Sequence, residues 1–179
     1  MNAPMFTRFG LKIGLTVALA LAVTAAAQQT TGNWHTFTDA TGRFSFLVPG
    51  EPQHQTQKDE SHKGGPIVTD TYVANTQTNA FIAGLTQYPP AVPLEDQQEL
   101  TADRDNFDKE VKATVVSEER RQYGGFPAVE FKSKSEQANF HVLMVKADHR
   151  VYCTVAVYKT AEEPVECVRF VSSLKLINP

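Results

Sequence analysis

Two neighbouring segments in the C-terminal half of the chain are apolar on both of their faces. In residues 139–147, Phe140 and Val142 share one face, while Leu143 lies on the other face, which is also apolar. Residues 151–158 show the same pattern. Successive side chains of a β-strand point to opposite faces, so such a segment needs cover on both sides. The sequence therefore predicts two adjacent central strands inside a layered fold.

Two amphipathic segments can supply that cover. From residue 94 to residue 113 the apolar period becomes helical, with Leu100, Phe107 and Val111 on one stripe, and the helix begins anywhere between residues 94 and 101. Residues 161–174 form a second helical segment, which opens with acidic residues and a proline in its first turn. Each stripe is wide enough to cover one face of a sheet.

These elements predict an antiparallel sheet with helices on both faces, an α-β-α sandwich of the α+β class. A cystatin-like or NTF2-like fold, which also wraps a curved antiparallel sheet around a helix, is the alternative. Residues 34–48 form a hairpin around the turn at Gly42. The other predicted strands are residues 67–74, 80–88, 114–121 and 127–133. Residues 53–60 are wholly polar, which leaves open whether they form a strand or a loop.

The N-terminal segment has the features of a secretory signal peptide. Arg8 and Lys12 precede a short apolar run, and Ala25 and Ala27 provide small residues at a cleavage site. We therefore expect residues 1–27 to be removed on export to the periplasm or the extracellular space. Residues 28–33 are then a short disordered leader, and residues 34–179 form a single domain.

Composition argues against nucleic-acid binding and against a membrane span after cleavage of the signal. The chain has 17 basic and 20 acidic residues with no basic cluster, whereas nucleic-acid binding needs concentrated positive charge. After the first apolar run, no stretch of about 18 apolar residues follows, so we expect no membrane span once the signal is cleaved.

Several turn and core motifs resemble one known family. They are Trp34 with Phe37, the motif Gly-Arg-Phe-Ser-Phe at 42–46, Pro-Gly-Glu-Pro at 49–52, Gly-Gly-Phe-Pro-Ala-Val-Glu-Phe at 124–131, and Phe-Val-Ser-Ser-Leu-Lys-Leu at 170–176. Together they resemble bacterial exported domains of the PsbP/Mog1-like family. The resemblance implies an α-β-α sandwich. It also implies binding rather than catalysis, because its better-known members bind other proteins and no catalytic motif carries over.

Two cysteines, Cys153 and Cys167, remain after the signal peptide. An even count in an exported chain favours a disulfide, which would close a loop of roughly 15 residues and contribute about 3 kcal/mol. The alternative is two buried thiols that pack as small hydrophobic groups. The sequence leaves both open.

The histidines provide the only metal or catalytic hypothesis. His54 and His62 lie in a polar segment with two carboxylates, and His141 lies among apolar strand residues, where it could act as a base. Neither has the spacing of a known metal motif. The acidic residues Asp103, Asp105, Asp108 and Glu110 do not fit a calcium loop, and alternation with basic residues assigns them to a solvated helix face.

The sequence therefore favours an exported, non-enzymatic binding or accessory domain without a cofactor, whose partner is a protein of the cell envelope. Tyr88, next to a rigid proline pair, and Trp34 are the aromatic residues that we expect to contact this partner. The alternative is a metal-binding or hydrolytic extracytoplasmic domain that uses His54 with His62, or His141.

Overall fold

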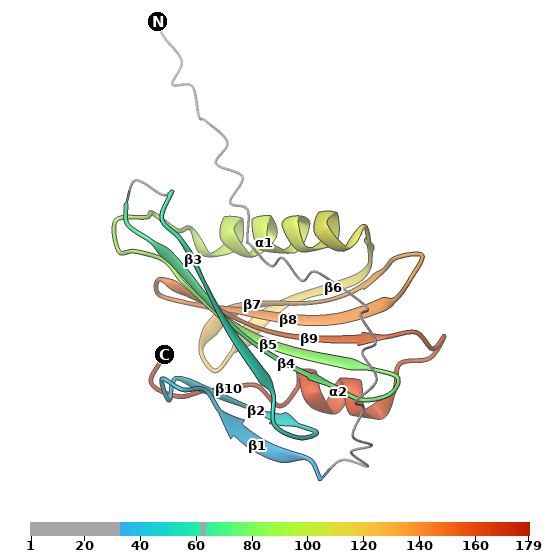
Figure 1. The fold of residues 1–179 in the computed structure, drawn as a ribbon. Helices are drawn as coiled ribbons and strands as arrows, with labels where there is room; N and C mark the ends of the chain where they lie inside the picture. Colours follow the sequence, from blue (N-terminus) through green and yellow to red (C-terminus); the bar gives the residue numbers. More distant parts are fainter. Residues whose placement is uncertain (1–32, 62–63) are drawn as a thin grey trace, which may run out of the picture.

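The computed structural model describes residues 33–61 and 64–179, and these residues form two antiparallel sheets and two α-helices (Figure 1). The predicted signal peptide, residues 1–27, lies outside the described residues, as does the leader up to residue 32. Within the part that the structure describes, neither helix is long and apolar enough to cross a bilayer.

The larger sheet has seven strands in the order β3-β4-β5-β9-β8-β7-β6, all paired antiparallel. Their bounds are β3 Gln53–Asp59, β4 Ile67–Asn75, β5 Ala80–Gln87, β6 Thr114–Tyr123, β7 Phe126–Lys134, β8 Asn139–Ala147 and β9 Arg150–Tyr158. The two segments that are apolar on both faces are β8 and β9, which pair with each other in the middle of the sheet. The prediction of two adjacent central strands is confirmed.

The smaller sheet consists of three short strands. β1 (His35–Thr38) and β2 (Phe44–Val48) form the predicted hairpin, and β10 (Lys175–Leu176) pairs with the other side of β2. Asp39 holds the connecting turn, because its carboxylate accepts hydrogen bonds from the backbone N–H groups of Arg43 and Phe44 at 2.6 and 2.8 Å.

The two helices pack against different hydrophobic clusters. α1 (Asp96–Val111) places Leu100 and Phe107 in a cluster with the β7, β8 and β9 side chains that alternate to one side of the large sheet. α2 (Val165–Val171) belongs to the other cluster, together with the small sheet and the opposite side chains of the same strands. Figure 1 shows α1 on one side of the large sheet, with α2 and the small sheet on the other.

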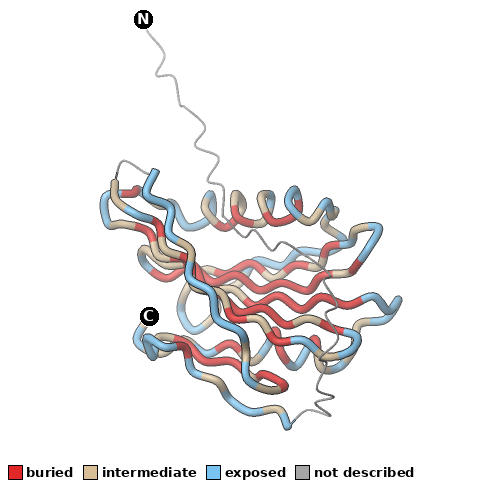
Figure 2. The backbone as a smooth tube through the Cα atoms, viewed as in Figure 1, coloured by how far each residue is buried: buried red, intermediate tan, exposed pale blue. Residues whose placement is uncertain are grey.

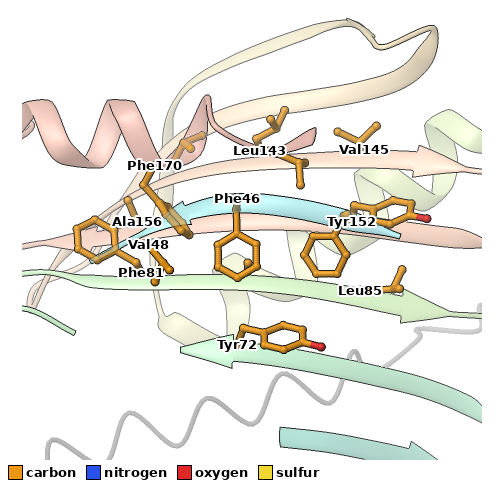
Figure 3. Packing of buried hydrophobic residues seen from close by; sticks show 14 of the residues in the cluster. Phe46, Val48, Tyr72, Phe81, Leu85, Leu143, Val145, Tyr152, Ala156 and Phe170 are labelled. Carbon is orange, nitrogen blue, oxygen red and sulfur yellow. The ribbon is translucent and has the colours of Figure 1, made fainter. Parts of the chain in front are cut away.

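Buried positions follow the central strands of the large sheet, while β3 at its edge is mostly exposed (Figure 2). The cluster between the two sheets is rich in aromatic rings (Figure 3). In that cluster Phe46 lies 6.1 Å from Phe170 and 6.0 Å from Tyr72, measured between ring centroids. Such tilted and edge-to-face pairs stabilise beyond the area they bury.

The described residues are thus mostly antiparallel sheet with two helices, the α+β class that the sequence predicts. The structure supports the full α-β-α sandwich less directly. On the α2 face of the large sheet the cover is shared, because α2 has only 7 residues and the small sheet packs beside it. The polar segment whose state the sequence left open forms edge strand β3, which pairs with β4 over its whole length.

Candidate functional site

A pocket lies between α1 and the large sheet. Its cavity volume is about 30 Å³, and the cavity opens to solvent. α1 contributes Asp103, Phe107 and Glu110 to its wall. The central strands contribute an apolar floor that includes Met144 and Val155. A concave, largely apolar site with a few polar groups is the usual form of a small-molecule binding site.

A glycine gives the pocket part of its depth. Gly84 of β5 lies opposite Cys153 of β9 in the sheet, and both residues line the pocket. A Cβ atom at position 84 would lie 3.1 Å from the Cys153 sulfur and 3.3 Å from the backbone oxygen of Asp70. A side chain at this position would therefore require the Cys153 sulfur or the Asp70 backbone to shift by a few tenths of an ångström.

Asp103 is the most unusual group in the pocket wall. It is 0% exposed, and neither of its carboxylate oxygens has a hydrogen-bond partner among the described residues. Burial, together with the nearby charge of Glu99, raises the pKa of Asp103 well above its usual value of 3.8. A buried carboxyl group without partners is costly to fold, so its presence beside a cavity indicates a function rather than a structural role.

The assignment of Asp103 and Asp108 to a solvated face is wrong. Both are buried, and Asp103 falls between Leu100 and Phe107 on the apolar stripe of α1. The signal was available in the sequence, because residues 100, 103 and 107 share one face of a helix. Asp105 is exposed as expected and pairs with Arg104 at 2.6 Å.

The structure buries Tyr88, which the sequence placed at a partner-binding surface. Its side chain belongs to the cluster under α1 and is 5% exposed, and burial raises the pKa of its hydroxyl above the usual range. The adjacent proline pair therefore does not present the ring to solvent. Trp34 is half-buried: its ring lies 5.1 Å from that of Phe81 and 5.1 Å beneath the Arg169 guanidinium.

Of the two states that the sequence leaves open for Cys153 and Cys167, the structure shows free thiols and no disulfide. Strand alternation explains the separation. Cys153 points toward the α1 cluster, whereas Cys167 of α2 lies in the cluster on the opposite side of the sheet. Burial raises the pKa of each thiol to about 12, so both behave as buried hydrophobic groups, the alternative reading of the sequence.

The histidines of the metal hypothesis lie far apart in the fold, as far as the structure describes them. His54 of β3 stacks on Tyr72 at 4.4 Å, and its Nε2 atom lies 3.0 Å from the Asp70 carboxylate. Its predicted companion His62 lies outside the described residues. In the described part of the chain, no three histidine, cysteine or acidic residues lie close enough together to hold a metal ion.

His141 lies between two carboxylates on the α2 side of the sheet. Its Nδ1 atom is 2.5 Å from Glu163 and its Nε2 atom is 2.8 Å from Glu130. Ionised carboxylates only accept hydrogen bonds, so this geometry is satisfied when both ring nitrogens donate. Arg121 and Lys132 pair with the outer oxygens of the same acids at 2.5 and 2.6 Å. The row is an ion-pair network in which each carboxylate oxygen of Glu130 and Glu163 already has a partner in the chain.

We expect His141→Gln to lower the free energy of unfolding by about 1 to 3 kcal/mol at neutral pH, because it leaves a part-buried carboxylate without its partner. A hydrogen bond from His141, helped by one from Arg121, lowers the pKa of Glu130 to about 2. This stabilisation is present above the ordinary glutamate pKa and is lost as pH falls from there toward 2. The difference between variant and parent in urea unfolding should therefore shrink in acid. His35→Gln, at an exposed histidine, is the control, and an equal loss in both variants would contradict the assignment.

No protein-family model matches the chain, and a comparison with curated protein sequences finds no match. A search of solved structures finds cyanobacterial PsbP (CyanoP) from Synechocystis, with a TM-score of 0.52 and 11% identity over 80% of this chain and 92% of that one. A Bacteroides thetaiotaomicron protein aligns with a TM-score of 0.38 and 12% identity over 79% of this chain and 48% of that one.

At 11% identity the first similarity concerns the fold alone. It covers nearly all of the solved PsbP structure and most of this chain. It agrees with the resemblance seen in the sequence motifs and favours that architecture over the cystatin-like or NTF2-like alternative. The chain therefore has a PsbP-like fold.

Proposed function

We propose that this chain is an exported, non-enzymatic binding protein of the periplasm or the extracellular space, and that it binds a small molecule in the pocket beside α1. The signal-peptide features of residues 1–27 support export. The α-β-α description of the fold is part of this proposal, with α1 as the layer that forms one wall of the site. The predicted envelope protein partner stays a prediction.

One observation carries the proposal: Asp103 is fully buried, has no hydrogen-bond partner among the described residues, and lines a largely apolar cavity. A group of this kind lowers stability in the free protein and gains a partner only when a ligand enters. The alternative of a metal-binding or hydrolytic domain has no comparable support, because the contacts of His54 and His141 are with residues of the chain itself.

We expect single-ring compounds to bind this pocket and a larger side chain in its wall to exclude them. Thr71 of β4 lines the pocket and is only partly buried, so Thr71→Phe adds volume there with little strain on the core. Val73→Phe, two residues along the same face of the strand but outside the pocket lining, is the matched control.

The measurement is a titration of the ¹⁵N-labelled protein with benzyl alcohol, benzylamine and benzoate, followed by amide chemical shifts. Binding by at least one compound should shift amides of β5, β9 and α1, and Thr71→Phe should weaken that binding by at least about tenfold while Val73→Phe does not. If none of the three compounds shifts the pocket amides, or if both variants bind equally well, the pocket is not the binding site.

A further inference from the structure

We propose that the pocket beside α1 selects an organic cation, an amine carried on a small apolar body, through the side chain of Asp103. This inference rests on the proposed function, because it names the class of ligand for the same site. It is argued from the charges around the pocket, the state of Asp103 and the chemistry of the apolar walls.

The charged groups around the pocket are of one sign. Asp103 and Glu110 line it from α1, and no basic side chain lines it among the residues that the structure describes. The other titratable groups that act on this region are Glu99, the Tyr88 hydroxyl and the Cys153 thiol, none of which carries positive charge. Lys146 acts on Glu99, but its ammonium group already pairs with Asp96 at 2.9 Å and donates to the Asp148 carbonyl at 2.6 Å. An anion would therefore find no positively charged partner here.

A cationic ligand would give the Asp103 carboxylate the hydrogen-bond donors that the described residues do not provide. Neither of its oxygens has a hydrogen-bond partner among the described residues, and burial raises the pKa of the group, which favours its neutral form. When an ammonium group enters, Asp103 releases its proton to the solvent, and the resulting carboxylate accepts charge-assisted hydrogen bonds from the ligand N–H groups. Such bonds are roughly twice as strong as neutral ones.

The other walls of the pocket are suited to the apolar part of a ligand rather than to a second polar group. Phe107, Met144 and Val155 present a ring, a thioether and a branched aliphatic group. An aromatic face and a polarizable sulfur both interact favourably with a cation or with a ligand ring nearby. Thr69 and Thr86 also line the pocket, but their hydroxyl oxygens lie 3.2 Å apart and bond to each other. Asp103 is thus the group that sets the ligand class.

The experiment compares three probes of nearly equal size and different charge: benzylamine, benzyl alcohol and benzoate. At pH 8, we expect benzylamine to bind at least about tenfold more tightly than benzyl alcohol, and benzoate to bind most weakly. Asp103→Asn should weaken benzylamine by at least about tenfold and change benzyl alcohol by no more than about twofold. Asp105→Asn, at an exposed acid on the same helix, should change neither.

The pH dependence provides a second readout. Benzylamine binding requires Asp103 to lose its proton, so its affinity should rise as pH rises through the raised pKa of Asp103, while that of benzyl alcohol should not. If benzyl alcohol binds as tightly as benzylamine, or if Asp103→Asn leaves the preference intact, the cation inference is overturned while the pocket remains a binding site. If no probe shifts the pocket amides, the proposed function and this inference both fail.

Discussion

Replacing Phe170 by alanine should lower the free energy of unfolding by about 3 to 5 kcal/mol, the range for a large aromatic side chain removed from a packed core. Phe170 is 0% exposed and is the residue through which α2 joins the two sheets. Its ring lies 5.1 Å from Phe81 of β5 and 6.1 Å from Phe46 of β2 (Figure 3). Removing it leaves a cavity where three elements meet.

The loss can be measured by urea unfolding of purified protein, followed by circular dichroism and tryptophan fluorescence. Val168→Ala, at a position of the same helix that is 45% exposed, is the matched control and should change stability by less than about 1 kcal/mol. If Phe170→Ala does not fold, Phe170→Leu keeps most of the volume and should cost less. Equal stability of Phe170→Ala and Val168→Ala would mean that α2 is not part of the core.

The sequence predicted the central strands and the first helix well, because both have strong periodic patterns. β8 and β9 are apolar on both faces, a pattern typical of a strand that is covered on two sides. α1 spans residues 96–111, inside the predicted range of 94–113. The short strand β10 was not predicted, because two residues paired with β2 are too few to carry a pattern. β3 has no apolar face, and only pairing with β4 makes it a strand.

The candidate site was harder to predict, because it depends on which residues the fold brings together. Asp103 carries no sign of burial in its residue type; only its position between Leu100 and Phe107 indicates it. Gly84 and Cys153 are far apart in the sequence and meet through strand pairing. The state of the two cysteines stayed open for the same reason, because sequence spacing does not show that a sheet separates the two thiols.

The stability of Asp103→Asn relative to the parent should increase as pH rises, because the parent loses stability that the variant keeps. Burial raises the pKa of Asp103 in the folded state, so the folded parent holds a proton that the unfolded chain releases above its ordinary pKa near 3.8. The contribution of the protonated group is fully present below that value and is lost as pH rises toward the folded-state pKa, at about 1.4 kcal/mol per pH unit. Asparagine does not titrate, so the variant lacks this loss.

The measurement is the free energy of urea unfolding of parent, Asp103→Asn and the exposed-site control Asp105→Asn across the acid-to-neutral range. The parent and Asp103→Asn should differ least near pH 4 and diverge above it, whereas Asp105→Asn should run parallel to the parent. Because Glu99 also raises the pKa of Asp103, part of the divergence belongs to the pair. Parallel curves for all three proteins would show that Asp103 is not held neutral by burial. A stabilised Asp103→Asn that has also lost benzylamine binding would show that the chain tolerates an unstable group because the ligand needs it.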